Sequence, residues 1–421
     1  MESYALDADY ALLQDQKDVL RDFRDKFYIP KQSNGQDTHY FTGNSLGAQP
    51  KDVVPYVMKE LETWKYLGVE GHHQNGSPWI LYQQLLTDKA ADLIGGKPTE
   101  VVFMNSLTVN LHLMLVSFYR PTATRYKILI NANLFPSDYY ALCSVVKFHG
   151  LDPAKAIVVL PASNKGIVPA EEIDTILHNE GASIALVMME AINYYSGQAF
   201  DIAHITKMAH QQGCVVGFDL AHAMGNRELT LHEDQVDFAV WCSYKYLNGG
   251  PGTIGGCFVH QKHHKDDLPR LAGWWGHELQ TRFMNNLEFK PIEGAEGWQL
   301  SNPSILSLAC LRASLDIFQQ AGMKRLREKS IRLTGYLEFL VNAVDHPNLS
   351  VITPQQASER GCQLTLLVKH QAGDLLERLK CAGFICDLRP PNRLRIAPVP
   401  LYNTFSDVYE LYRFLKQEAD K

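Results

Sequence analysis

The feature that most constrains the fold is an alternation of two sequence patterns between residues 100 and 260. Short runs of β-branched and apolar residues alternate with longer segments that place apolar residues at helical spacing. Strands joined through helices run parallel, because a parallel connection needs a crossover of about a dozen residues. The pattern therefore predicts an α/β fold with a mainly parallel sheet. The seven predicted strands are EVVFMN, YKILINA, AIVVL, SIALVMM, CVVGFDL, FAVWCS and GGCFVH.

The sequence pattern divides the chain into three parts. Residues 1–45 are polar and predict an arm, with one helix at residues 9–27, that joins a small domain. Residues 46–305 hold the alternating pattern and predict a large domain. After Pro303 a long amphipathic stretch leads into further short apolar runs, so residues 306–421 predict a smaller α+β domain at the C-terminus.

Composition and charge exclude several classes of protein. The 421 residues carry a formal net charge of -6, so no basic field attracts nucleic acid. No apolar run approaches the length of a membrane span, and the acidic N-terminal stretch lacks the pattern of a secretory signal. The eight cysteines are scattered and form no Cys-x-x-Cys pair. We therefore expect a reduced, soluble, cytoplasmic protein that binds neither nucleic acid nor membranes.

Three glycines, Gly250, Gly252 and Gly255, have the spacing of a dinucleotide-binding fingerprint. That fingerprint requires a helix after the glycines and an acidic residue about 20 positions further on. Here the run GGCFVH follows, which is typical of a strand, and the acidic position falls in the polar turn HHKDDLPR. The glycines therefore predict a tight turn between two strands, and a nicotinamide-dependent dehydrogenase is excluded.

The same turn presents a lysine, Lys245, after the apolar run FAVWCS and between two tyrosines. A lysine amine in an apolar setting forms Schiff bases readily, which is the chemistry of pyridoxal phosphate enzymes. A surface lysine at the end of a strand is the alternative interpretation. The residues that follow the other predicted strands decide between the two.

Pyridoxal phosphate needs four further kinds of contact, and the sequence offers a candidate for each. Asp219 ends a predicted strand, where a carboxylate can pair with the ring nitrogen. The turn near Leu107 and Thr108 opens a predicted helix, whose free N–H groups bind anions. Phe135 can stack on the ring, and Arg395, costly on an apolar strand, can hold a substrate carboxylate. Taken singly, Asp219 and Thr108 are explained equally well as ordinary helix caps. Because the candidates all follow the ends of predicted strands, a chance grouping is a poor explanation.

Longer stretches of the chain closely resemble the kynureninase family, pyridoxal phosphate hydrolases of the aspartate aminotransferase fold (fold type I). The resemblance extends over nearly the whole length and includes motifs specific to that family. The matching stretches are YFTGNSLGAQP (40–50), NSLTVNLH (105–112), FPSD (135–138), GFDLAHAMGN (217–226), WCSYKYLNGGPG (241–252), GWWGHEL (273–279), SNP (301–303) and RIAPVPLYN (395–403).

The resemblance implies a role for each matching residue. Lys245 carries pyridoxal phosphate covalently, and Asp219 pairs with the pyridine nitrogen, with His222 close by. The other cofactor contacts that it implies within the chain are Leu107, Thr108, Phe135, Pro136, Ser137, Asp138 and Tyr244. Two more cofactor residues, Trp274 and Asn302, reach in from a neighbouring subunit, so the resemblance also implies a homodimer.

The activity that the resemblance implies is hydrolysis of the Cβ–Cγ bond of L-kynurenine or 3-hydroxy-L-kynurenine. The products are L-alanine and anthranilate or 3-hydroxyanthranilate, within tryptophan catabolism and de novo NAD synthesis through quinolinate. Lys245 acts as the base at the substrate α-carbon, Asp219 supports charge on the cofactor ring, and Arg395 holds the substrate carboxylate. Tyr244 is the candidate for moving protons in the later steps, for which its pKa of about 10 would need to be lowered.

Three residues match a family set that is typical of the hydroxylated substrate, namely His72, Ser301 and Asn302. A site built to hydrogen-bond a hydroxyl discriminates well against analogues without it, so the resemblance implies a preference for 3-hydroxykynurenine. The residues alone favour an exposed loop histidine at His72. One departure is Glu190, which stands where the family usually has Ser or Thr, so that contact is not carried over.

Other functions of the same fold stay open as alternatives. A cysteine desulfurase needs a reactive cysteine on a flexible loop, and the sequence offers no such segment. An aminotransferase, or a relative that binds the cofactor without catalysis, is the other alternative, although the intact Lys245, Asp219 and Arg395 argue against an inactive protein. The histidine pairs at 72–73 and 263–264 predict no metal site, because adjacent side chains rarely point the same way and no partners stand at ligand spacing.

Overall fold

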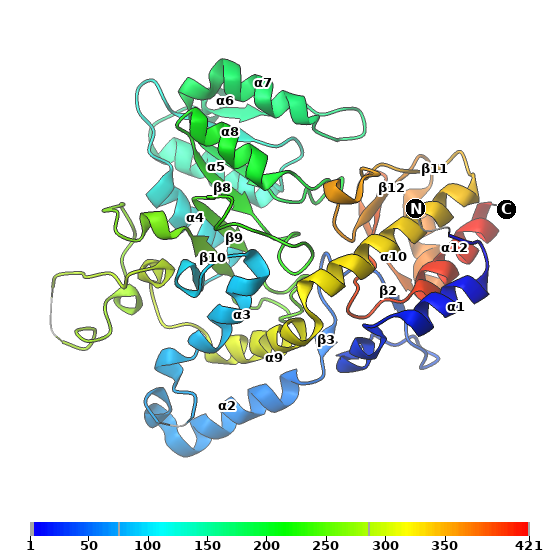
Figure 1. Ribbon diagram of the computed structural model, residues 1–421, viewed down its shortest axis with the longest axis horizontal. Helices are drawn as coiled ribbons and strands as arrows, with labels where there is room; N and C mark the ends of the chain where they lie inside the picture. The colour runs from blue at the N-terminus through cyan, green and yellow to red at the C-terminus, as the bar shows by residue number, and fades with distance from the viewer. Residues whose placement is uncertain (1–3, 75, 285–286, 420–421) are drawn as a thin grey trace.

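The computed structural model describes residues 4–74, 76–284 and 287–419 and contains a large and a small domain (Figure 1). All seven strands predicted from the alternating pattern form one sheet in the order β4-β10-β9-β8-β7-β5-β6. β10 runs antiparallel to both of its neighbours, and the other adjacent pairs are parallel. The strands are β4 (Val101–Phe103), β5 (Lys127–Ile130), β6 (Ile157–Val159), β7 (Ile184–Glu190), β8 (Val215–Asp219), β9 (Phe238–Trp241) and β10 (Gly256–Val259).

Helices cover both faces of this sheet, and two apolar cores result. Side chains alternate between the faces along each strand, so Ile128 and Ile130 enter one core and Leu129 the other. This explains why the strands are apolar throughout rather than at every second residue. One face is covered by α4 (Leu107–Phe118) and α5 (Pro136–Phe148); the other is covered by α3 (Gln84–Ile94), α7 (Ala170–Glu180), α8 (Ile202–Gln211) and α9 (Ile305–Ala321).

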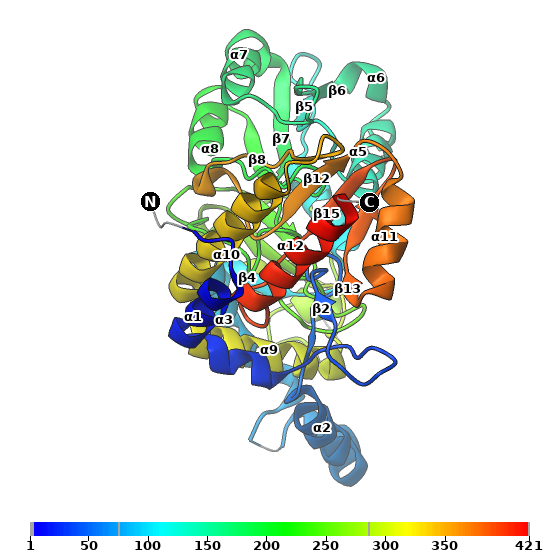
Figure 2. The ribbon, with the colours of Figure 1, turned by 90° about the vertical axis from the view of Figure 1, so that its right-hand side faces the viewer.

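The long amphipathic stretch after Pro303 forms two helices, because Gly322 adopts a positive φ of 75° between them. α9 packs against α3 and against α2 (Val53–Leu67), which projects from the body of the molecule (Figure 2). α10 (Met323–Val344) instead packs against α12 (Phe405–Ala419). The core of the small domain therefore begins at α10, one helix after the predicted boundary at residue 305.

The small domain is an antiparallel sheet with helices on it, in the order β11-β12-β15-β14. Its core joins this sheet to α10, α12 and α11 (Ala372–Cys381). Among the residues described, no helix combines the length and apolar character that a membrane span requires. The strands are β11 (Leu349–Val351), β12 (Leu364–Val368), β14 (Asp387–Arg389) and β15 (Arg393–Ile396).

The N-terminal arm adds to the small domain, where β2 (His39–Tyr40) pairs in parallel with β13 (Phe384–Ile385). The prediction of a single helix over residues 9–27 is wrong in extent. α1 (Ala8–Lys17) stops at Lys17, and a short 3-10 turn follows at residues 21–26. The cause is Asp18, whose carboxylate accepts a hydrogen bond from the backbone N–H of Leu20 and forms a buried ion pair with Lys329 at 2.7 Å.

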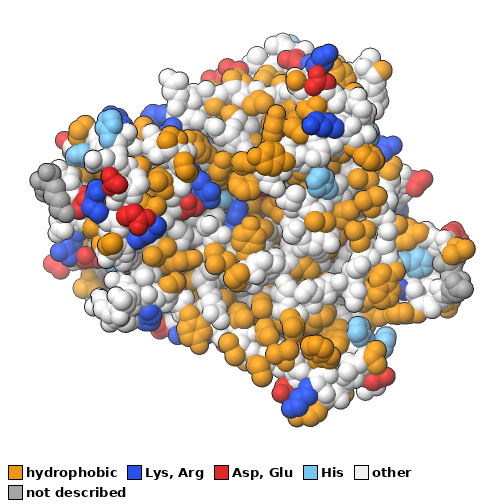
Figure 3. Space-filling view, turned by 180° about the vertical axis from the view of Figure 1, so that it is seen from behind, with side chains coloured by type: hydrophobic (Ala, Val, Ile, Leu, Met, Phe, Trp, Pro, Cys, Tyr) orange, Lys and Arg blue, Asp and Glu red, His pale blue; other side chains and the backbone are white. Residues whose placement is uncertain are grey.

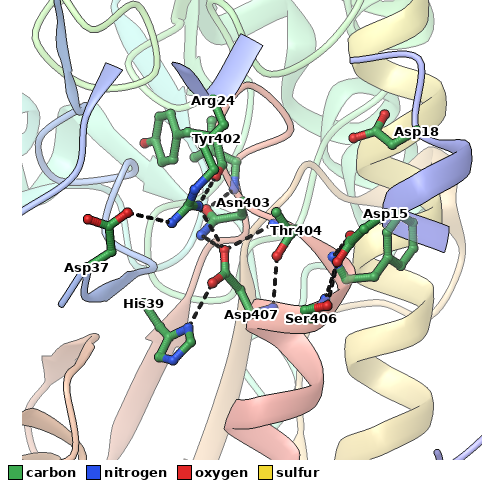
Figure 4. A network of polar contacts seen from close by, with 12 residues as sticks. Asp15, Asp18, Arg24, Asp37, His39, Tyr402, Asn403, Thr404, Ser406 and Asp407 are labelled. Atoms are coloured by element: carbon green, nitrogen blue, oxygen red, sulfur yellow. Dashed lines mark hydrogen bonds and ion pairs between the residues drawn. The ribbon is translucent and has the colours of Figure 1, made fainter. Parts of the chain in front are cut away.

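A polar network fixes the arm to the start of α12 (Figure 4). Asp407 is buried and accepts hydrogen bonds from His39 Nδ1 at 2.8 Å and from Arg24 at 3.2 Å. Arg24 also donates to the carbonyl oxygen of Tyr402 and to Asp37. Burial alone would raise the pKa of Asp407, but the hydrogen bond from His39 and the charge of Arg24 outweigh it and lower this pKa.

Replacing Asp407 with Ala is expected to lower the free energy of unfolding at neutral pH by about 3 to 5 kcal/mol, because Arg24 and His39 lose their buried acceptor. A carboxyl whose folded pKa is lowered stabilises the protein above its unfolded pKa of about 4 and loses that contribution as the pH falls through the folded pKa. The gap between wild type and variant should therefore narrow in acid. Urea unfolding across this pH range measures it, and equal loss in Asp22→Ala, whose side chain is 89% exposed, would contradict the assignment.

Candidate active site

The functional candidates gather at the carboxyl edge of the large sheet, where the parallel strands end. β7 ends at Glu190 and β8 at Asp219, and these two residues are partners in register. β9 leads within four residues to Lys245, and β5 leads to Phe135 just before α5. Residues scattered over 110 positions of sequence are thus brought to one edge by the strand order.

The turn that carries Lys245 is held from two sides. The amide of Gly47, just after the arm, donates to the carbonyl of Tyr244 at 2.8 Å, and that of Asn248 donates to the carbonyl of Lys245 at 2.9 Å. A Cβ on Gly47 would lie 2.4 Å from that Lys245 oxygen, so only glycine allows this approach. Lys245 Nζ lies 5.7 Å from the centre of the Phe135 ring.

The glycines after Lys245 form the predicted tight turn. Gly250 and Gly252 adopt φ values of 95° and 67°, and β10 follows in place of a helix. A Cβ on Gly255 would lie 2.8 Å from the carbonyl oxygen of Trp241 and 3.2 Å from the amide nitrogen of Leu107. The rejection of a dinucleotide fingerprint is confirmed, and the turn passes directly against the start of α4.

Two helix N-termini converge beside this turn and form a cup for an anion. α4 begins at Leu107 and α5 at Pro136, and the side-chain oxygens of Thr108 and Ser137 lie 2.9 Å apart. The first amides of each helix have no partner within the helix, and the helix dipoles add partial positive charge. This geometry suits the phosphate group of a cofactor.

Two buried carboxyls, Asp138 on α5 and Asp219 on β8, interact below the lysine. Asp219 accepts a hydrogen bond from the amide of Ala221 at 2.7 Å, whereas no N–H or O–H donor of the described residues reaches either oxygen of Asp138. Burial raises both pKa values; the charge of Asp219 raises that of Asp138 further, while Asp138 and Lys245 hold that of Asp219 down. Asp138 is therefore the member of the pair that binds a proton more readily, and Asp219 is the one that ionises more readily, which suits a cationic ring nitrogen.

His222 is buried near this pair, and its Nδ1 has no hydrogen-bond partner within the described part of the chain. Burial lowers the pKa of His222 well below its usual range, and the positive charges of Lys245, Arg395 and Arg389 lower it further. The imidazole is consequently neutral at physiological pH. A neutral ring with a free nitrogen suits contact with a planar cofactor.

Arg395 reaches this region from β15 of the small domain and is only 1% exposed. It donates to the carbonyl of Tyr194 at 3.0 Å and forms an ion pair with Asp387, its partner in register on β14, while its Nε lacks a partner among the described residues. Asp387 also accepts from Arg389 at 3.2 Å. The sequence analysis missed Asp387, although the segment DLRPPNRLR reads as a hairpin that would pair it with Arg395.

The surroundings of Tyr244 shift its pKa in the direction opposite to the one that its expected role requires. Burial raises its pKa, and the neighbouring Cys242 and Asp219 raise it further because each disfavours a phenolate. Tyr244 therefore keeps its proton in this structure. A protonated phenol can donate a hydrogen bond or a proton, but it cannot act as a base.

Four candidates lie outside this cluster. Ser301 and Asn302 line a cavity of about 550 Å³ together with the glycine turn and Asn105, behind the start of α4. Trp274 is 46% exposed and packs on Phe283. His72 Nδ1 donates to the carbonyl of Val69 at 3.1 Å, and its ring packs on Trp79. In the described part of the chain, His72 and Trp274 form their ring contacts with residues other than Lys245.

A second polar cluster lies at the opposite edge of the sheet and was not predicted. Ligand-type atoms of Glu100, His232 and His260 lie within 4.8 Å of one another. Glu100 accepts hydrogen bonds from the amides of Lys97 and Gln261 at 2.8 Å each, and His260 accepts one from Lys262. Because these atoms already bind backbone groups, the cluster is explained as a structural link between strand ends.

Comparison with known proteins gives consistent matches. A family model described as "Kynureninase C-terminal domain" matches residues 326–415. The kynureninase of Myxococcus xanthus is 53% identical over 412 residues, covering 97% of each chain, and that of Koribacter versatilis is 53% identical over 402 residues, covering 95% of each.

Solved structures show the same fold at low sequence identity. A C-DES mutant with glycine covalently linked to its PLP cofactor matches with a TM-score of 0.77 and 16% identity, covering 93% of this chain and 98% of that one. The cysteine desulfurase CsdA of Escherichia coli matches with a TM-score of 0.74 and 18% identity, covering 95% and 98%. The fold is that of the fold type I pyridoxal phosphate enzymes.

Proposed function

The chain belongs to the kynureninase family of pyridoxal phosphate-dependent hydrolases, and from that premise we propose that it hydrolyses L-kynurenine and 3-hydroxy-L-kynurenine. Water adds its oxygen to Cγ, a proton ends on Cβ, and the bond between them breaks to release the aromatic acid and L-alanine. The observation that carries the proposal is the 53% identity to a kynureninase over 97% of both chains.

The residues at the sheet edge fit the cofactor that this family uses. Lys245 would hold it covalently, and Asp219 would face its ring nitrogen, with Asp138 as a neighbour of Asp219. The phosphate would lie in the cup between the starts of α4 and α5, with Leu107, Thr108 and Tyr244 in contact. Phe135, Pro136, Ser137 and His222 would surround the ring. When bound, pyridoxal phosphate supplies an electron sink for a carbanion at the substrate α-carbon.

Each side chain has a distinct task in this proposal. Lys245 Nζ takes the proton from the substrate α-carbon, and Asp219 keeps the ring nitrogen protonated. Arg395 holds the substrate carboxylate and orients it by charge-assisted hydrogen bonds. Tyr244, whose pKa is raised by burial, donates its proton toward Cβ before alanine leaves.

The other functions of this fold have weaker support. The cysteine desulfurases that match are 16–18% identical to this chain, a similarity that shows the fold alone. Among the cysteines described, Cys381 is the exposed one, and it lies on α11 rather than on a loop. An inactive binding protein is disfavoured by the complete set of Lys245, Asp219 and Arg395.

The preference for the 3-hydroxy substrate is part of the proposal and rests on His72, Ser301 and Asn302. The last two line the cavity beside the glycine turn, and in a dimer they would hydrogen-bond the ring hydroxyl of a substrate bound to the neighbouring subunit. This preference assigns the enzyme to the cytoplasmic branch of tryptophan catabolism that leads through quinolinate to NAD.

Alanine release from L-kynurenine and from 3-hydroxy-L-kynurenine, measured side by side with added cofactor, is expected to have the larger kcat/KM for the hydroxylated substrate. Ser301→Ala should narrow this ratio roughly tenfold, because a hydrogen bond to the ring hydroxyl is lost. If kcat/KM were smaller for the hydroxylated substrate, His72, Ser301 and Asn302 would not be the residues that recognise a ring hydroxyl, but the proposed hydrolysis would still stand. No alanine from either substrate would refute the proposed reaction.

Replacing Lys245 with Ala is expected to reduce alanine release by at least about 10⁴-fold, because both the covalent link and the base at the α-carbon are lost. Cofactor should still bind through its phosphate and ring contacts. Equilibrium dialysis and the visible spectrum of the bound cofactor measure this, with Lys262→Ala, outside the site, as the control. Turnover at the wild-type rate would contradict the role of Lys245.

A homodimer is also proposed, because two candidate cofactor residues, Trp274 and Asn302, lie apart from Lys245 in one chain. Apolar side chains gather over the lower part of one face, in the region of α2 and α9 (Figure 3). The exposed apolar residues there are Val54, Met58, Trp64, Tyr66, Val69 and Leu306. A patch of this kind on a projecting helix is typical of a protein interface.

The double variant Met58→Asp, Trp64→Asp is expected to sediment as a monomer and to bind cofactor more weakly, because the neighbour no longer supplies Trp274 and Asn302. Phe148→Asp is the matched control, since Phe148 is 86% exposed on α5, away from this patch. Sedimentation velocity and cofactor titration measure both effects. An unchanged dimer in the double variant would place the interface elsewhere.

A further inference from the structure

Glu190 is a third carboxyl at the cofactor site, and the roles carried over from the family leave it unexplained. It ends β7 in register with Asp219 on the parallel neighbour β8. Registered residues on parallel strands point to the same face, with side chains roughly 5 Å apart. That face is the one covered by α5, which contributes Asp138. Glu190, Asp219 and Asp138 therefore surround one small buried volume.

The two carboxyl oxygens of Glu190 accept different hydrogen bonds. Oε2 accepts from the side-chain amides of Asn131 at 3.0 Å and Asn193 at 2.7 Å. Oε1 accepts only a long contact of 3.4 Å from the amide of Tyr194. The backbone amide of Glu190 donates to Asn131 Oδ1 at 3.0 Å, which fixes the orientation of the side-chain amide of Asn131. The carboxyl is thus anchored through one oxygen, and the other is the place for a proton.

The charges that face this carboxyl come from several elements. Asp219 on β8 and Asp138 on α5 are acidic, and Tyr194 and the neutral His222 add no charge at physiological pH. Lys245 after β9 acts on Asp138 and Asp219. Burial and the charge of Asp219 raise the pKa of Glu190 to about 8, against the lowering effect of the two asparagine amides. Three neighbouring buried carboxyls cannot all be ionised.

We infer, on the basis of the proposed function, that Glu190 is a positioning residue for the ring nitrogen of the cofactor and acts through Asp219. While Glu190 is neutral, Asp219 is the single carboxylate of the group and faces the ring nitrogen alone. When Glu190 ionises, a second negative charge on the same face favours a protonated ring more strongly. A Ser or Thr at this position has no such charge to add.

The test compares the dissociation constants of two cofactors, measured in the absence of substrate at about pH 6.5 and about pH 9, on either side of the pKa of Glu190 of about 8. One cofactor is pyridoxal phosphate, and the other is its analogue with carbon in place of the ring nitrogen. The variants are Glu190→Gln and Glu190→Thr, both permanently neutral; the second keeps the test valid if the first does not fold. Asp234→Asn is the control, because it removes another carboxyl of raised pKa outside the site.

For pyridoxal phosphate, wild type and both variants should bind equally at the lower pH, and the variants should bind on the order of tenfold more weakly at the higher pH. For the analogue, wild type and variants should agree at both values. Equal binding of pyridoxal phosphate at high pH, a loss that is the same at both pH values, or an equal loss for both cofactors would overturn the inference. Failure of wild type to bind pyridoxal phosphate at all would instead refute the proposed function.

Discussion

The balance of buried charge at the carboxyl edge of the sheet is the constraint on which the rest of the site depends. A carboxylate without a partner in a protein interior costs several kcal/mol, so Asp219 can be ionised there only with local compensation. The amide of Ala221, the proton on Asp138 and the amine of Lys245 supply it. A ring nitrogen that binds a proton completes this arrangement, which is why the site suits a pyridine cofactor and not a neutral ligand.

The same balance requires the two domains and the arm to stay together. Arg395 belongs to the small domain, yet its charge acts on His222 of the large domain. The side chain of Asn226 connects the two, since it donates to the carbonyl of His222 at 2.9 Å and accepts from the amide of Cys362 at 3.0 Å. The segment just after the arm contacts the Lys245 turn through Gly47, and the arm itself pairs with the small domain through β2, so the parts of the chain that carry Lys245 and Arg395 share one support.

Much of the fold was predictable from sequence because its signals are local. Seven strands were placed correctly, since runs such as SIALVMM are apolar at every position, as strands buried on both faces are. The rejection of the dinucleotide fingerprint rested on the strand pattern after Gly255, which is also local. The arm helix was overextended because the break at Asp18 depends on Lys329, more than 300 residues away. The pairing of Arg395 with Asp387 depends on the register of a hairpin, which the sequence analysis did not predict.

The sequence by itself determined the layer architecture, the lysine after β9, the acidic residue that ends β8 and the resemblance to the kynureninase family, because periodicity and motif spacing act over short distances. The tertiary structure alone decided which groups share a buried volume. Asp138, Glu190 and Asp219 come from three separate elements, and their charge states follow from mutual distance and exclusion of water rather than from residue type. The raised pKa of Tyr244 has the same origin. Electrostatic energy depends on the distance between charges and on the local dielectric constant, and both are set only when the chain has folded.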